Sequence, residues 1–215
     1  MATYALIHGG GDVGWYWHLV VAALRERGHD AVAPDLPCED DSAGLWEYAD
    51  SVVDAVGERE ELVVVGHSYG AFTAPLVCDR APVELLVLVA GMIPAPGERP
   101  DDWWANTGYQ SEGGPDDDVI ATYYHDVPPE LAAEALRRER DQSATPGRQP
   151  WPLESWPDVP TRILLCRDDR LFSPDFMRRV ARERLGIVPD EIDGGHCVAL
   201  GRPKELAERL EGYLS

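Results

Sequence analysis

The chain has 215 residues and a formal net charge of −20, with 39 acidic and 19 basic residues. Such a surface repels phosphate backbones and anionic lipids, so nucleic-acid partners and membrane surfaces are not expected. The composition, 44% hydrophobic and 27% charged, is that of an ordinary globular domain large enough to bury a sizeable core.

The start of the chain and its cysteines indicate a compartment. An apolar run begins at Tyr4 without the basic start of a secretory signal, and no run approaches the ~18 apolar residues of a membrane span. The four cysteines show neither C-x-x-C nor paired spacing: Cys38, Cys78, Cys166 and Cys197. We therefore expect reduced thiols in a cytoplasmic protein.

In the first part of the chain, short apolar runs alternate with amphipathic stretches. Apolar runs typical of buried strands cover residues 4–7, 31–36, 61–65 and 85–90. Apolar residues at helical spacing follow in residues 15–27 and 42–56, and a further helix is expected after residue 68. Ser42 suits the N-cap of the second helix, and Pro75 predicts an irregular turn early in the third.

The alternation resumes after residue 157. Residues 161–166 and 188–192 are expected to form strands, and residues 174–185 and 203–214 helices. Because strands and helices alternate, we predict an α/β fold with a mostly parallel sheet of about six strands and helices on both of its faces.

Between Met92 and Pro157 the alternation breaks down, and the segment is rich in Pro, Gly, acidic and aromatic residues. A structureless loop of this length is uncommon in a compact domain. We therefore expect a core of residues 1–93 and 158–215, and a helical lid of residues 94–157 over the carboxyl ends of the strands, where open α/β sheets bind ligands. Weak helical patterns lie at residues 116–125 and 129–140.

The lid is expected to select the substrate. Its aromatic side chains offer flat apolar surfaces, although local packing accounts for most of them: Trp103, Trp104, Tyr109, Tyr123, Tyr124, Trp151 and Trp156. Its acidic side chains predict a solvated face that disfavours anionic substrates: Asp101, Asp102, Glu112, Asp116, Asp117 and Asp118.

The stretch Gly66-His67-Ser68-Tyr69-Gly70 is a Gly-x-Ser-x-Gly motif between an apolar, β-branched run and residues able to start a helix. That context is what a nucleophile elbow requires, a tight strand-to-helix turn that lifts a serine above the sheet. The first free N–H groups of the helix then favour negative charge at the same point. We therefore identify Ser68 as the candidate nucleophile. The alternative is a Gly-x-Ser-x-Gly match that arises by chance in an ordinary loop, and the strand before the motif and the helix after it make that alternative the weaker one.

A serine hydroxyl needs a base to take its proton. His196 ends an Asp-Gly-Gly-His run after the last predicted strand, and the glycines allow a loop that returns its ring over the sheet. A carboxylate should orient this histidine. Residues 166–174 resemble the pattern Gly-x-x-Asp-x-x-x-Pro, with Cys166 in the place of the glycine and Pro174 one residue later than the pattern has its proline. This spacing favours Asp169 over Asp168. The order Ser, Asp, His is that of elbow-type hydrolases.

The oxyanion of acyl transfer needs two N–H donors. We expect one from Tyr69, which follows the nucleophile, and the other from Gly10, in the glycine loop after the first strand. His8, which opens this loop, is expected to orient its backbone. The loop from Gly9 to Gly14 also fits Gly-x-Gly-x-x-Gly in part, but no basic residue follows closely, so nucleotide binding is disfavoured.

Together these motifs resemble the α/β-hydrolase-fold serine hydrolases over nearly the whole chain outside the lid. Gly14-Trp15-x-Trp17 and Gly28-His29 are similar to the plant methylesterase and hydroxynitrile lyase subgroup. The lyases carry a threonine after the first loop histidine and a lysine after the catalytic histidine, where this chain has Gly9 and Cys197. The resemblance therefore implies hydrolysis of small or medium carboxylic esters through an acyl-enzyme on Ser68, without a metal or organic cofactor.

Other interpretations stay open. The same triad can turn over a thioester or a lactone, and the fold also hosts non-hydrolytic lyases and ligand receptors. A nucleophilic Cys–His pair at Cys197 is a further alternative, although Cys197 lacks an elbow. The expected partner is a small ester-like molecule, and a homodimer stays open beside a monomer.

Overall fold

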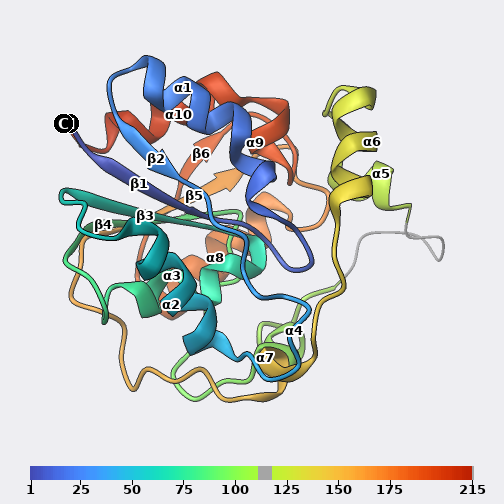
Figure 1. The fold of residues 1–215 in the computed structure, drawn as a ribbon. Helices are drawn as coiled ribbons and strands as arrows, with labels where there is room; N and C mark the ends of the chain where they lie inside the picture. Colours follow the sequence, from blue (N-terminus) through green and yellow to red (C-terminus); the bar gives the residue numbers. More distant parts are fainter. Residues whose placement is uncertain (111–117, 215) are drawn as a thin grey trace.

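The computed structural model describes residues 1–110 and 118–214, and its centre is a six-stranded sheet (Figure 1). Neighbouring strands run parallel, in the order β2-β1-β3-β4-β5-β6. The strands are β1 (Thr3–Ile7), β2 (Asp30–Val32), β3 (Leu62–His67), β4 (Val83–Val89), β5 (Thr161–Cys166) and β6 (Asp190–Ile192). The predicted α/β architecture with a parallel sheet is confirmed.

The strands are apolar on both sides, which explains why helices cover both faces of the sheet. In β1, Tyr4 and Leu6 pack into one core cluster, and Ala5 and Ile7 pack into the other. Successive side chains point to opposite faces, so such a strand needs cover on both. The helices are α1 (His18–Glu26), α9 (Val198–Gly201) and α10 (Pro203–Gly212) on one face, and α2 (Leu45–Val56), α3 (Ala74–Val77) and α8 (Pro174–Leu185) on the other (Figure 1).

Strand β2 ends at Val32, so the predicted end at Leu36 is wrong. The Leu36 N–H donates to His8 Nε2 at 3.0 Å instead of to a neighbouring strand. Pro34 has no N–H to contribute to a ladder. The segment after Val32 is therefore held by the histidine that opens the glycine loop.

Helix α2 begins at Leu45, and Ser42 is not its cap, in contrast to the prediction. The Ser42 N–H and hydroxyl both donate to Asp40 Oδ1, at 2.8 and 2.6 Å. Gly44 precedes the helix, and its N–H donates to the Glu47 carboxylate at 2.8 Å. Ser42 is thus bound within a local turn, and the Glu47 carboxylate, in the first turn of the helix, accepts the N–H of the residue that precedes the helix.

The chain after β3 is irregular, as Pro75 predicts. It forms the 3₁₀ helix η2 (Ser68–Phe72) and then the short helix α3, with Pro75 in its first turn. Proline is tolerated there because the first N–H groups of a helix have no partner within it. A second 3₁₀ helix, η1 (Gly14–Trp17), leads into α1.

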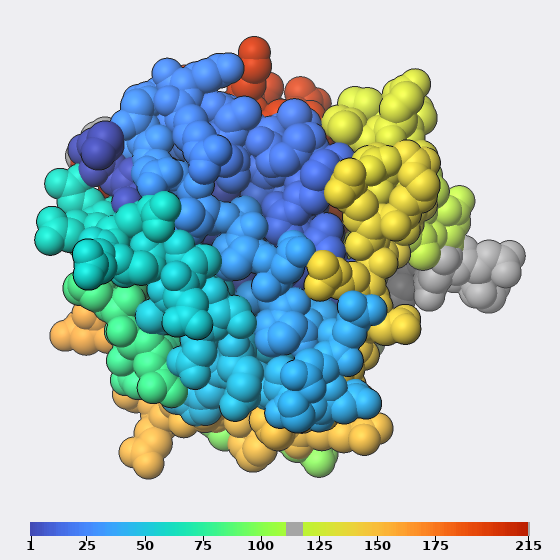
Figure 2. Space-filling model, in the orientation of Figure 1, coloured from blue at the N-terminus to red at the C-terminus, as the bar shows by residue number. Residues whose placement is uncertain are grey.

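The chain between β4 and β5 lies beside the loops that follow β1 and β3 (Figure 1). Residues 130–150, yellow in Figure 2, pack against the blue N-terminal segment, where the Arg140 N–H donates to the Gly11 carbonyl at 2.7 Å. The described elements are η3 (Pro100–Asp102), α4 (Trp103–Asn106), α5 (Val119–Tyr123), α6 (Pro129–Arg138) and α7 (Thr145–Arg148). The division into a core and a lid over residues 94–157 stays a prediction.

Two tryptophans anchor this insert to the core cluster on the face of the sheet that α2, α3 and α8 cover. Trp103 and Trp151 are buried, and their indole N–H groups donate to the Ile93 and Phe72 carbonyls, each at 2.9 Å. Glu112, Asp116 and Asp117 of the predicted acidic face lie outside the described residues. Across the described residues, every helix falls short of the length and apolar character that crossing a bilayer requires.

Candidate active site

Ser68 stands at a strained turn directly after β3. Its φ is 51°, in the left-handed region that residues other than glycine rarely adopt. A Cβ on Gly66 would lie 2.8 Å from the Ala74 Cβ, and one on Gly70 would lie 2.5 Å from the His8 carbonyl oxygen. The two glycines are therefore required by close packing around the bend, as expected for a nucleophile elbow.

One hydrogen-bonded chain joins Ser68, His196 and Asp169. His196 Nε2 lies 3.0 Å from Ser68 Oγ, and His196 Nδ1 lies 2.9 Å from Asp169 Oδ2. The imidazole and the carboxylate are both buried. In the tautomer that suits both contacts, Nδ1–H donates to the carboxylate and Nε2 accepts the serine proton. The structure thus brings together the three side chains that the sequence singled out.

The two neighbouring acids have different partners. Asp169 Oδ1 accepts the N–H groups of Leu171 and Phe172 at 2.8 and 3.0 Å, which fixes the carboxylate while Oδ2 faces His196. Asp168 Oδ2 instead accepts the Gly194 N–H at 3.0 Å. Geometry therefore favours Asp169 as the acid, and gives Asp168 a role in joining two loops.

Two further histidines support the site in their neutral form. Burial lowers the pKa of His8 to about 4, and its Nδ1–H donates to the Gly9 carbonyl at 2.8 Å. Burial also holds the pKa of His67 well below its usual value, and its Nε2–H donates to the His196 carbonyl at 2.9 Å. His8 thus orients the glycine loop, as expected, and His67 fixes the backbone of the candidate base.

Ser68 opens into a cavity of about 390 Å³. Gly10 and Tyr69, the two predicted oxyanion donors, both line it, and a Cβ on Gly10 would lie 3.5 Å from the Tyr69 Cβ. The insert contributes Trp104, Val119 and Tyr123 to the same walls. The cavity is therefore bounded by the elbow, the glycine loop and the insert.

Cys197 also lines this cavity, next to His196 in the chain. Burial holds the pKa of its thiol well above the usual value, and nearby carboxylates, Asp12 first among them, act in the same direction. A thiol held protonated is a poor nucleophile. The Cys–His alternative is therefore disfavoured, and none of the four cysteines forms a disulfide.

Asp12 is a cavity residue that the sequence did not single out. Burial, with smaller contributions from nearby acidic residues, raises the pKa of its carboxyl to about 7. Asp12 Oδ1 accepts the Val13 N–H at 2.8 Å. Its place directly after the glycine loop was the one available signal.

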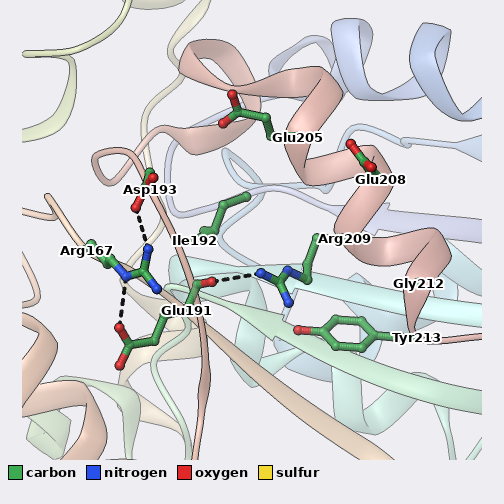
Figure 3. A pocket seen from close by; sticks show the side chains of 9 residues that line it. All are labelled: Arg167, Glu191, Ile192, Asp193, Glu205, Glu208, Arg209, Gly212 and Tyr213. Carbon is green, nitrogen blue, oxygen red and sulfur yellow. Dashed lines mark hydrogen bonds and ion pairs between the residues drawn. The ribbon is translucent and has the colours of Figure 1, made fainter.

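A second cavity, of about 440 Å³, lies at the β6 edge of the sheet (Figure 3). Three of its charged side chains are paired with each other: Arg167 contacts Glu191 at 3.0 Å and Asp193 at 2.6 Å. Arg209 donates to the Glu191 carbonyl at 3.2 Å. None of the described residues around it is a serine or a cysteine. Among the described residues, no group of three or more His, Cys, Asp or Glu could hold a metal ion.

Comparisons with known proteins bear on the family and the fold. A family model described as the alpha/beta hydrolase family matches residues 5–209. Over 107 residues the chain is 39% identical to a probable esterase, PIR7A, of Oryza sativa subsp. indica, covering 44% of this chain and 41% of the rice protein. Over 258 residues it is 22% identical to norfluorocurarine synthase 1 of a Strychnos species, covering 97% of this chain and 93% of that protein. The crystal structure of polyneuridine aldehyde esterase matches with a TM-score of 0.83 at 19% identity, over the whole of both chains.

Proposed function

This chain belongs to the alpha/beta hydrolase family, and we propose that it hydrolyses carboxylic esters of small or medium-sized molecules through an acyl-enzyme on Ser68. The observation that carries the proposal is the hydrogen-bonded chain from Ser68 through His196 to Asp169 at the floor of a cavity. The match to a rice esterase spans only about two fifths of that protein, and supports the same activity.

In the first half of the reaction, Ser68 Oγ attacks the acyl carbon while its proton moves to His196 Nε2. Asp169 holds the ring through Nδ1–H and stabilises the imidazolium that forms. The N–H groups of Gly10 and Tyr69 bind the oxygen that becomes negative. The tetrahedral intermediate then collapses, the imidazolium gives its proton to the leaving alcohol, and the acyl group stays on Ser68.

In the second half, a water molecule replaces the alcohol. His196 takes one of its protons as the water oxygen attacks the acyl carbon, and the same two N–H groups bind the second oxyanion. Collapse returns the proton to Ser68 Oγ and releases the carboxylic acid. Every proton transfer uses His196, so the cycle needs no metal and no organic cofactor.

The cavity supports a substrate of modest size. Its volume of about 390 Å³ lies at the small end of ligand pockets, and Trp104, Val119 and Tyr123 give it apolar walls. Gly9 backs onto the nucleophile, where a Cβ would lie 3.4 Å from the Ser68 Cβ, and offers no hydroxyl there. This favours ester hydrolysis over the chemistry of the resembled lyases, which carry a threonine at this place.

The proposal also covers the compartment, the kind of partner and the oligomeric state of the protein. The four unpaired cysteines support a reducing compartment, for which we propose the cytoplasm. The net charge of −20 supports a small-molecule partner over nucleic acid. A homodimer is compatible with the fold, and size-exclusion chromatography with light scattering decides it.

The proposed function is tested with a panel of nitrophenyl esters, a matched thioester and a lactone. Wild-type protein is expected to turn over the esters, Ser68→Ala to lose at least about 10³-fold in kcat, and Ser42→Ala, at an exposed serine, to match the wild type. Faster turnover of the thioester or the lactone would reassign the substrate class. Ester turnover that survives Ser68→Ala would overturn the proposal.

A further inference from the structure

The turn between α5 and α6 places two polar side chains on the loops that carry the acid and the base. His125 Nε2–H donates to the Asp168 carbonyl at 2.9 Å. Asp126 Oδ2 accepts the Gly195 N–H at 2.7 Å. Asp168 precedes the acid of the triad in sequence, and Gly195 precedes its base. Two adjacent residues of the insert therefore hold both loops.

Packing around Gly195 shows how close this contact is. A Cβ on Gly195 would lie 2.6 Å from Asp126 Oδ1 and 2.7 Å from His125 Nε2. A Cβ on Gly201 would lie 3.3 Å from Asp126 Oδ2. A larger residue at position 195 would therefore have to displace the two insert side chains that fill the space beside it.

Asp126 is held in place at a cost. Its Oδ1 is buried and has no hydrogen-bond partner among the residues that the structure describes. A buried polar atom without a partner is unfavourable. The other oxygen makes the contact to the base loop.

The two loops also bind each other. The Asp168 N–H donates to the Gly194 carbonyl at 3.0 Å, and the Gly194 N–H donates to Asp168 Oδ2 at 3.0 Å. The acid loop and the base loop are thus one hydrogen-bonded unit. The His125–Asp126 turn makes one hydrogen bond to each half of that unit.

We propose that His125 and Asp126 are positioning residues, which hold the backbones of the acid and base loops so that His196 stays within hydrogen-bond reach of Ser68 and Asp169. This inference rests on the proposed triad. Neither side chain is assigned a contact with substrate.

The same segment links the base to the substrate wall. Val119 and Tyr123 of α5 line the cavity, and the Tyr123 ring meets the His196 ring edge-on at 5.4 Å between centroids. The Cys197 N–H donates to the Tyr123 carbonyl at 3.4 Å. A substrate that packs against α5 would therefore contact the same helix that packs against His196.

The test compares Asp126→Ala with Asp126→Asn. Alanine removes the acceptor for the Gly195 N–H, whereas the asparagine amide oxygen keeps it. We expect Asp126→Ala to lower kcat by about 10- to 100-fold with KM within about threefold, because a small misplacement of the base slows chemistry more than binding. Asp126→Asn should keep kcat within about fivefold of wild type, and Glu130→Ala, at an exposed acid on α6, should leave it unchanged.

A readout without substrate separates this inference from the proposed function. The His196 Nδ1–H proton, bonded to Asp169, should give a downfield NMR signal that Asp126→Asn retains and Asp126→Ala loses or broadens. If wild type cleaves no ester, the proposed function fails and this signal alone decides the positioning role.

Two results would overturn the inference. One is a folded Asp126→Ala protein, shown by its thermal unfolding, with wild-type kcat and an unchanged His196 signal. The other is equal loss in the alanine and asparagine variants, which would remove the hydrogen bond as the cause. If Asp126→Ala does not fold, His125→Ala is the second variant, because it removes the bond to the Asp168 carbonyl and the packing beside Gly195; wild-type kcat with an unchanged His196 signal in that variant would overturn the inference.

Discussion

Glu98 of the insert and Arg184 of α8 form an almost buried ion pair. Their side chains are 4% and 13% exposed, and Arg184 Nη2 lies 2.6 Å from Glu98 Oε1. Arg184 Nη1 also donates to the Ile93 carbonyl at 2.6 Å, and Glu98 accepts the Ala95 N–H at 3.1 Å. This pair ties the first part of the insert to the helix that follows the acid loop.

Breaking this pair should destabilise the protein strongly. We expect Glu98→Ala to lower the free energy of unfolding by about 3–5 kcal/mol, because it leaves the buried guanidinium without its partner. Urea unfolding followed by circular dichroism measures the change. Asp102→Ala is the matched control, since it breaks an exposed pair with Arg99 and should have little effect. Equal effects of the two variants would contradict the role given to the buried pair.

Asp168 and Asp169 should differ in their effect on catalysis. Asp169→Asn is expected to lower kcat by about 10²- to 10⁴-fold, because the amide no longer fixes the tautomer of His196. Asp168→Asn should cost about tenfold or less, since its carboxylate binds only the Gly194 N–H. Steady-state kinetics on one ester measures both. A larger loss in Asp168→Asn would show that the acid has been assigned to the wrong residue.

Asp12 should make the substrate preference depend on pH. Its pKa is raised to about 7, chiefly by burial, so the carboxyl in the cavity is neutral below that pH and charged above it. Glu139 and Asp35 act in the same direction, while Arg140, also in the cavity wall, is paired with Asp35 at 2.9 Å. We expect kcat/KM for acetylcholine, relative to its neutral isostere 3,3-dimethylbutyl acetate, to rise about fivefold to tenfold through pH 7.

The control for that preference is Asp12→Asn, which should flatten the pH dependence of the ratio. Asp54→Asn, at an exposed acid on α2, should keep it. A ratio that rises equally in wild type and Asp12→Asn would assign the effect to another group.

The same carboxyl should also affect stability. A folded-state pKa of about 7, against the ordinary carboxyl pKa of 3.8, means that the folded protein holds this proton more tightly. The stability that results is fully present below about pH 4 and is lost as the pH rises through 7. Asp12→Asn should therefore gain stability relative to wild type between pH 4 and 8, measured by urea unfolding at each pH. A difference that is constant with pH would contradict the raised pKa.

The parts of the site that depend on local sequence could be predicted. The elbow is recognisable because Gly66, Ser68 and Gly70 sit between a β-branched run and a helix start, and the glycines are needed for close packing at that bend. Spacing alone favours Asp169 over Asp168, and the hydrogen bond between Asp169 and His196 agrees with it.

Contacts that compete with a local pattern, and contacts that join distant parts of the chain, could not be predicted. Ser42 could cap a helix, but its hydroxyl donates to Asp40 instead, and no sequence pattern indicates which of the two interactions forms. Likewise, Asp126 lies 69 positions from Gly195, and nothing around either residue signals that they meet. The contact between Asp126 and Gly195 is set by how the insert folds back on the core.

The most direct test of the central claim is labelling with a fluorophosphonate, mapped by mass spectrometry of the peptides. We expect one label per chain, on Ser68, with labelling abolished in Ser68→Ala and slowed at least about 10²-fold in His196→Ala, because the serine is activated by its base. Labelling of another residue, or an undiminished rate in His196→Ala, would contradict the account of a serine activated by that histidine.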